Sequence, residues 1–198
     1  MAMAAARDDW LVGFQDETWW SRLRRPGMAS WAESGHPQRL VEGKAPSDDP
    51  DPKALACYGL WLPEQDQTWL RFVDGRPVSA ITTQFLTWCA DQAAQVPGIT
   101  RLVLIWDNAS WHTSGIVRQA VREHNQQVQR RGTGVTLVPC PLPSQSPWLN
   151  PIEPKWLHAK RQIVEPERVL SLAEVENRVC QALACPHHDH LSLSNDVR

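Results

Sequence analysis

Three acidic residues stand where the sequence predicts that rigid elements meet loops. Asp16 follows the apolar run 10–15, Asp107 follows the apolar run 101–106, and Glu153 lies at the start of a helix after a proline-rich loop. In an α/β sheet, strand tips and neighbouring helix starts converge on one crevice. Carboxylates brought together there repel one another, and a divalent cation is the usual remedy. The three acids therefore predict a site for Mg²⁺ or Mn²⁺.

The chemistry that such a site favours is phosphoryl transfer. Two ions ~3.5–4 Å apart can hold the attacking and leaving oxygens of a phosphodiester displacement. An isolated aspartate at a strand end is more often a helix cap or a solvated turn residue. The sequence around the acids must therefore decide between these alternatives.

The first half of the chain predicts strands and one helix. The expected elements are a strand at 10–15 that ends at Asp16, a short second strand within 30–41, an exposed loop rich in Pro, Asp and Gly at 42–53, a hairpin of strands 54–62 and 68–73, and a helix at 79–95 behind a Ser79 cap. This helix leads into the strand at 101–106.

The second half predicts a parallel βαβ unit followed by two helices. A polar-faced helix at 114–130 and a buried strand at 135–142 follow the strand at 101–106. A helix at 152–164 has Pro151 near its first turn, and a helix at 171–184 opens with a capping box. The sequence thus predicts one α/β domain.

Composition excludes several function classes. The 198 residues are 42% hydrophobic, which is ample for one packed domain. The 20 basic against 22 acidic residues lack the excess positive charge of a self-sufficient nucleic-acid binder. No glycine-rich phosphate loop, signal peptide or membrane-length apolar run is present, so we expect no contact with a membrane. Five cysteines without a CxxC pair argue against a disulfide framework and favour a reducing cytosol.

The segment CPHHDHLSLSNDVR at 185–198 contains three histidines and one cysteine within six residues. That composition could bind zinc. No second ligand pair at zinc-finger spacing accompanies it, so we interpret the segment as a frayed or tag-like tail.

The sequence motifs around the three acids resemble those of a known protein family. WDNASWHTS at 106–114 and SPWLNPIEPKW at 146–156 resemble the second and third acid motifs of DDE transposases, and DETWW at 16–20 resembles the first. The nearest group is that of the mariner-like bacterial insertion-sequence transposases. The resemblance covers residues 10–185 and implies an RNase H-like catalytic domain, an α/β fold with a mixed sheet flanked by helices. Residues 1–9 would be an N-terminal extension and 186–198 a C-terminal tail.

The resemblance also implies roles for individual residues. Asp16, Asp107 and Glu153 would be the catalytic, metal-binding triad, with Asp16 bridging two Mg²⁺ or Mn²⁺ ions. Residues that would orient the ligating carboxylates or contact DNA are Asn108, His112, Asn150, Trp148, Lys160 and Arg161.

Each of these supporting residues also has a structural interpretation. The two asparagines could be turn amides, and a lone histidine in the first turn of a helix is more often structural. Packing against Glu153's helix is favoured for Trp148 and Trp156 over stacking on a base. Basic residues near the acids could contact phosphates or be solvated: these are Arg22, Arg24, Arg25, Lys160 and Arg161.

The sequence departs from the family in two places. Forty-five residues separate Asp107 from Glu153, more than the commonest family spacing, and we place the excess in 124–134. A surface-loop insertion of this kind need not disturb a site. Family members usually carry N-terminal helix-turn-helix domains, and we expect none in the nine residues that precede the catalytic domain here. A split gene with a separate helix-turn-helix chain, a truncated remnant and an excised catalytic domain are the open explanations.

The sequence therefore predicts a DNA recombination enzyme. A water molecule activated by Mg²⁺ would cleave transposon ends, and the freed 3′-hydroxyl would attack target DNA. Transposon ends and target DNA are the expected partners, the expected assembly is a homodimer, and the expected location is the bacterial cytoplasm at the nucleoid. Two alternatives remain: an RNase H-like nuclease that hydrolyses without joining, and an inactive remnant that acts by binding or dimerisation.

Overall fold

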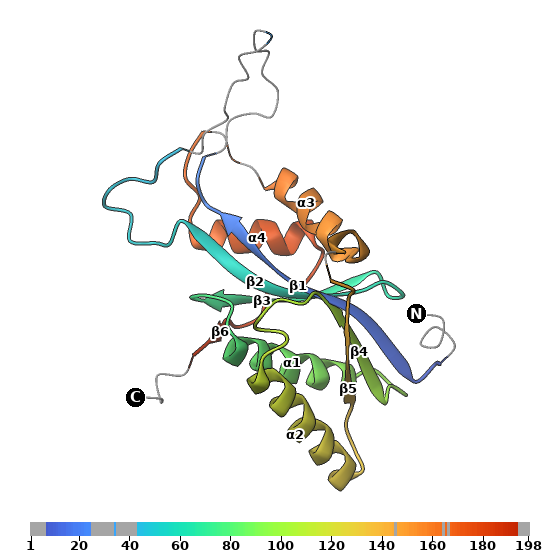
Figure 1. The fold of residues 1–198 in the computed structure, drawn as a ribbon. Helices are drawn as coiled ribbons and strands as arrows, with labels where there is room; N and C mark the ends of the chain where they lie inside the picture. The colour runs from blue at the N-terminus through green and yellow to red at the C-terminus, as the bar shows by residue number, and fades with distance from the viewer. Residues whose placement is uncertain are drawn as a thin grey trace.

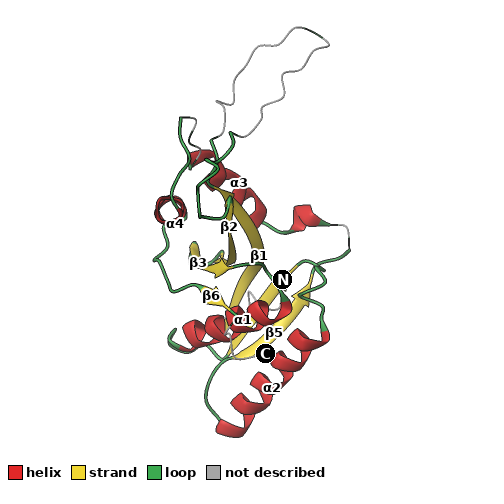
Figure 2. Ribbon diagram, turned by 90° about the vertical axis from the view of Figure 1, so that its left-hand side faces the viewer, coloured by secondary structure: helices red, strands yellow, loops and turns green. Residues whose placement is uncertain are grey.

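A mixed sheet with helices on both faces forms the molecule (Figures 1 and 2). This computed structural model describes residues 7–24, 34, 43–144, 146–163, 165 and 167–193. The strands are β1 (Trp10–Ser21), β2 (Ala54–Leu62), β3 (Gln67–Asp74), β4 (Arg101–Trp106), β5 (Thr136–Pro141) and β6 (Leu191–Ser192). The helices are α1 (Ser79–Ala94), α2 (Gly115–Arg131), α3 (Ile152–Gln162) and α4 (Leu172–Ala182), with a 3-10 turn η1 (Pro147–Leu149) before α3. Among these described helices, none has both the length and the apolar character needed to cross a membrane.

The six strands lie in the order β5-β4-β1-β2-β3-β6. Strands β1, β2 and β3 form an antiparallel meander, and β4 and β5 add in parallel beside β1. The predicted hairpin and the predicted parallel unit of β4, α2 and β5 are confirmed. The sheet is therefore antiparallel on one side of β1 and parallel on the other, so β1 is the strand that both halves share.

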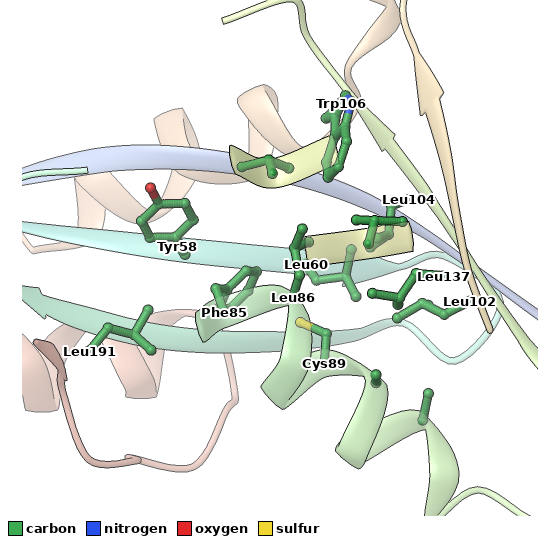
Figure 3. Packing of buried hydrophobic residues seen from close by; sticks show 14 of the residues in the cluster. Tyr58, Leu60, Phe85, Leu86, Cys89, Leu102, Leu104, Trp106, Leu137 and Leu191 are labelled. Carbon is green, nitrogen blue, oxygen red and sulfur yellow. The ribbon is translucent and has the colours of Figure 1, made fainter. Parts of the chain in front are cut away.

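Each face of the sheet has its own hydrophobic core. Helices α1 and α2 cover one face, where Tyr58, Phe85 and Leu104 belong to a single buried cluster (Figure 3). Helices α3 and α4 cover the other face, as Figure 1 shows, where residues of both helices belong to the second buried cluster and α3 packs on β1. Side chains of a strand alternate between faces, so Leu11 joins the first cluster while Val12 joins the second. Strand β1 is buried from both sides.

Strand β1 is longer than predicted, because it continues through Asp16 to Ser21. The sequence analysis ended this strand at the acidic pair. In the structure, β2 pairs with β1 from Phe14 to Ser21, so the acids lie inside a strand. The TWW segment that follows the acids is rich in residue types that favour strands. Asp16 is therefore held by a continuous ladder of backbone hydrogen bonds.

Three smaller predictions were wrong. Ser79 is the first residue of α1, and Val78 occupies the cap position without a side-chain hydrogen bond. Strand β5 is an edge strand whose second half is exposed, because β4 covers it on one side only. His112 lies in the loop before α2 and not within a helix. The strand expected within 30–41 lies outside the described residues, apart from residue 34, which is in a turn.

Arg22 is buried, which contradicts both interpretations given to it. Its side chain is 4% exposed and forms an ion pair with Asp49 at 3.0 Å. It also donates to the backbone carbonyls of Pro52, at 3.0 Å, and Leu170, at 2.8 Å. Arg22 therefore fastens the loop after residue 43 to the segment before α4, and its charge does not face solvent. Arg25 lies outside the described residues.

The C-terminal segment is packed against the sheet. The capping box of Ser171 and Glu174 opens α4 as predicted. After α4, the chain returns to the sheet, and β6 pairs in parallel with β3. Leu191 is 1% exposed and belongs to the core under α1. The interpretation as a frayed tail is therefore wrong for residues 185–193, because burial of this leucine and strand pairing order the segment.

A close approach of α3 to the sheet depends on Gly59, which pairs with Asp16 across β1 and β2. A Cβ atom at Gly59 would lie 2.3 Å from Cη2 of Trp156, a rigid ring on α3. We predict that Gly59→Ala lowers the free energy of unfolding by about 1–3 kcal/mol, because the overpacked ring must move. Urea denaturation of both proteins measures the difference.

Gly115→Ala is the matched control, since an added Cβ there meets no atom within 4 Å. This control should leave stability unchanged or raise it by up to about 1 kcal/mol. Equal effects of the two substitutions would contradict the close approach.

Candidate active site

A cleft of about 440 Å³ opens where β1 and β4 lie side by side. Phe14 pairs with Ile105 in the parallel ladder, so two residues further along the strands Asp16 and Asp107 are neighbours. Both line the cleft. The other lining residues are Glu17, Trp19, Arg76, Pro77 and Trp111. Parallel pairing thus brings together two acids that are distant in the sequence.

Asp16 is a half-buried carboxylate in an unfavourable electrostatic environment. Burial, followed by the neighbouring charge of Glu17, raises the pKa of Asp16 to about 7, and Asp107 adds a smaller contribution in the same direction. A hydrogen bond from Nε1 of Trp156 to Oδ2 of Asp16, at 3.0 Å, acts in the opposite direction. This bond also connects Asp16 to α3.

His112 bridges two carboxylates that approach from different strands. Its Nδ1 lies 2.8 Å from Oδ1 of Asp107, and its Nε2 lies 2.8 Å from Oε1 of Glu17. The side chain is fully buried and stacks on Trp106, with ring centroids 5.2 Å apart and an interplanar angle of 14°. Burial alone would lower the pKa of His112, but the hydrogen bonds to Asp107 and Glu17 raise it to about 9.

The imidazolium of His112 therefore stabilises both acids and sets the position of Asp107. Its hydrogen bond is the main cause that lowers the pKa of Asp107. Oδ1 of Asp107 also accepts from the backbone N–H of Ala109 at 3.0 Å. The side chain of His112 is enclosed by these contacts, and contact with DNA stays a prediction.

The cleft suits a divalent cation. The carboxylate oxygens of Asp16 and Asp107 are hard ligands of the kind that Mg²⁺ and Mn²⁺ prefer. The negative charge that raises the pKa of Asp16 is the kind that a bound cation neutralises. On these two observations the residues present fit the predicted metal.

Glu153 lies outside this cleft. It is the second residue of α3 and is exposed, while its backbone N–H donates to the carbonyl of Asn150 at 3.2 Å. Residues three apart share a face of a helix, so Glu153 stands on the same side of α3 as Trp156, which binds Asp16. The structure thus brings Asp16 and Asp107 together and directs the helix of Glu153 toward them, without placing Glu153 among the lining residues.

Asn108 and Asn150, which were expected to orient ligating carboxylates, have other surroundings in the structure. Nδ2 of Asn108 donates to the backbone carbonyl of Leu142 at 2.6 Å. This bond ties the end of β4 to the chain after β5 and orients no carboxylate. Asn150 is 2% exposed, and its Oδ1 has no hydrogen-bond partner among the described residues.

The aromatic and basic residues near α3 divide into buried and exposed ones. Trp156 is buried and packs edge-on against Trp20 at 6.0 Å, as the packing interpretation required. Trp148 is 75% exposed, so the packing interpretation was wrong for it. Lys160 donates to Oγ1 of Thr18 at 2.6 Å, and Arg161 is exposed.

The sequence analysis missed Glu17 as a functional side chain, because it treated the acidic pair as one motif. Neighbouring residues of a strand point to opposite faces. Asp16 therefore faces α3, where it meets Trp156, while Glu17 meets His112 from the loop before α2. Strand alternation was the signal that could have separated their roles. For Arg76 and Trp111, which also line the cleft, the sequence gave no comparable signal.

Comparison with known proteins identifies one matching family and one similar fold. The family model for the DDE superfamily endonuclease matches residues 12–176. No curated protein matches the chain.

Similar solved structures include several of Mos1. A Mos1 transposase paired-end complex with left transposon end is 17% identical, with a TM-score of 0.64, and the match covers 93% of this chain and 51% of that one. A Mos1 mariner paired end complex with Mn is 17% identical, with a TM-score of 0.61, and the match covers 88% and 48%. The catalytic domain of Mos1 mariner transposase is 16% identical, with a TM-score of 0.56, over 88% and 70%. The chain has the RNase H-like fold and spans about half the length of the first two structures.

The bridge of His112 can be measured by a double-mutant cycle with Glu17. We predict that His112→Ala lowers the free energy of unfolding by about 3–5 kcal/mol, because it leaves a buried carboxylate unpaired. In a Glu17→Gln background the same substitution should cost markedly less. Chemical denaturation of the four proteins without added metal gives the coupling energy. Equal costs in both backgrounds would show that the two side chains do not interact.

Proposed function

The chain belongs to the DDE superfamily endonuclease family, and from this we propose that it is the catalytic domain of a DNA transposase. It cleaves transposon ends and joins them to target DNA by in-line phosphoryl transfer. The observation that carries the proposal is that Asp16, within β1, and Asp107, directly after the parallel strand β4, line one cleft. The mariner-like bacterial insertion-sequence group is the proposed subfamily, and the bacterial cytoplasm at the nucleoid is its proposed location.

The metal ligands in this proposal are Asp16, Asp107 and Glu153. Two divalent ions would be held there, with Glu153 contributed from the first turn of α3. When bound, the ions supply activation of the attacking oxygen and stabilisation of charge on the phosphate. Similar structures described as Mos1 complexes with Mn and with Mg support the choice of Mg²⁺ or Mn²⁺.

The chain's own residues position these acids and receive the DNA. His112 holds Asp107 from the loop before α2, and Trp156 holds Asp16 from α3. Arg76 lines the cleft with a guanidinium group that can pair with a backbone phosphate. Trp148, exposed just before α3, presents an indole on which a base can stack.

The proposed partners are transposon ends and target DNA. The similar Mos1 structures are described as paired-end and strand transfer complexes, which supports DNA as the substrate. A homodimer is the proposed assembly. The net charge of −2 supports a further proposal, that a separate helix-turn-helix chain supplies much of the grip on DNA.

Metal binding tests the triad without knowledge of the DNA sequence. We predict that about 10 mM Mn²⁺ stabilises the wild-type protein by roughly 1.4 kcal/mol, for a dissociation constant of about 1 mM. Asp16→Asn, Asp107→Asn and Glu153→Gln should each abolish this gain, measured by thermal melting against the same variant without metal. Asp91→Asn, an exposed aspartate on α1, is the matched control and should keep it. A gain that persists in Glu153→Gln would remove Glu153 from the site.

DNA chemistry separates the transposase from its alternatives. We expect the wild-type protein with Mn²⁺ to nick supercoiled plasmid and to join a duplex oligonucleotide with a free 3′-hydroxyl to it. Asp107→Asn should reduce both activities by at least about 100-fold, because the metal ions provide most of the rate acceleration. Nicking without joined products would identify a nuclease, and absence of both would identify an inactive remnant.

A further inference from the structure

A cluster of one carboxylate and two imidazoles lies away from the acid cleft, between α4 and the C-terminal segment. Ligand atoms of Glu176, His187 and His190 all lie within 4.8 Å of one another. We propose that these three residues bind a borderline transition-metal ion, Zn²⁺ in preference to Mg²⁺. The ion fastens the segment 185–193 to α4.

Both imidazoles direct the same atom to the same carboxylate. Nε2 of His187 lies 3.0 Å from Oε2 of Glu176, and Nε2 of His190 lies 3.1 Å from Oε1 of Glu176. A cation among these atoms would be met by two nitrogens and a carboxylate oxygen. The three donors therefore converge without any change of backbone path.

The second ring nitrogen of His190 is also engaged. Its Nδ1 lies 2.6 Å from Oδ1 of Asp74, the last residue of β3. A metal-binding histidine characteristically donates its other N–H to a carboxylate, which fixes the tautomer and orients the ring. Asp74 thus leaves Nε2 of His190 as the nitrogen that can ligate a metal, and this contact is independent of the cluster itself.

The loop that carries the histidines is built around fixed partners. Arg71 on β3 donates to the backbone carbonyls of Asp189, at 2.7 Å, and His190, at 3.1 Å. Phe72 lies against both rings, with centroid distances of 5.8 Å to His187 and 5.7 Å to His190. Pairing of β6 with β3 follows directly. Contacts with the sheet therefore hold His187 and His190 in place without a bound metal.

The donor types decide which metal fits. Imidazole nitrogen suits Zn²⁺, whereas Mg²⁺ takes oxygen ligands and retains water. Two histidines and one glutamate supply three of the four ligands of tetrahedral zinc, so water can complete the set. The His187 side chain is 44% exposed, while that of Glu176 is 14% exposed. An ion can therefore enter from solvent toward a mostly enclosed carboxylate.

The cluster is separate from the acid cleft. Val73 stands opposite Ala56, which stands opposite Trp19, so Asp74 is about four residues further along the strand direction than Asp16. It is also two strands away. With strand spacings of ~4.8 Å and a rise of ~3.3 Å per residue, the backbones at the two sites are on the order of 15 Å apart.

Zinc titration calorimetry on the full chain, with affinity tags removed, tests the proposal. The titration is run at about pH 8, because metal binding displaces protons from its ligands and is favoured as the pH rises, with excess Mg²⁺ present to saturate the acid cleft. We expect one Zn²⁺ bound per chain with micromolar affinity. His190→Ala and Glu176→Gln should weaken binding by at least about 100-fold, and Asp74→Asn, which keeps all three ligands, by about 10- to 100-fold.

Two controls keep the outcomes distinct. His158→Ala removes an exposed histidine on α3 and should bind zinc as the wild type does. Asp107→Asn should also retain zinc, whether or not the proposed transposase activity is confirmed. Circular dichroism establishes that each variant is folded. If a ligand variant does not fold, Asp74→Asn, which keeps all three ligands, still tests the site.

No zinc binding by the wild type would mean that the cluster is only a set of ion pairs between a carboxylate and imidazolium groups. Loss in Asp107→Asn with retention in His190→Ala would place the zinc in the acid cleft. Either result overturns the proposal.

Discussion

The close approach of carboxylates from two neighbouring parallel strands, β1 and β4, is the constraint on which the site depends. The register of β1 and β4 sets Asp16 beside Asp107, and Glu17 follows at once on β1. Burial of Asp16, followed by the nearby charges of Glu17 and Asp107, raises the pKa of Asp16 to about 7. A fold that holds such a group needs compensating positive charge or a bound cation. His112 supplies the first, and the proposed metal supplies the second.

The two-faced sheet allows this compensation to come from two directions. Asp16 and Glu17 point to opposite faces of β1 because strand side chains alternate. Helix α3 reaches Asp16 through Trp156, and the loop before α2 reaches Glu17 through His112. The absence of a side chain at Gly59 lets the indole of Trp156 lie close to the sheet. Both layers of helices thus converge on one strand, and the precision of the site comes from their packing.

The C-terminal segment gives the far edge of the sheet a different kind of restraint. Residues 185–193 add only a two-residue strand, which is a short ladder for holding a chain end. Arg71, Phe72 and Asp74 on β3 make further contacts with this segment. The histidine and glutamate side chains there converge as metal ligands do. Oxygen donors where β1 and the end of β4 lie side by side, and nitrogen donors beyond β3, would allow one small domain to hold two kinds of metal.

The sequence by itself determined most of the local elements and two of the acids that line the cleft, Asp16 and Asp107. Alternating and helical apolar patterns predicted the hairpin, the parallel βαβ unit and the capped helix α4, because these depend on neighbouring residues. The acid motifs indicated Asp16, Asp107 and Glu153. Only tertiary structure decided that Asp16 lies within a strand, that His112 joins two acids, and that Asn108 binds a backbone carbonyl.

Only tertiary structure, likewise, decided that Arg22 is buried and that the C-terminal histidines meet Glu176. These contacts join residues far apart in the chain, and pattern reasoning over short windows carries no information about such distances. Burial and charge at each position therefore follow from how the layers pack on β1, which no local segment specifies.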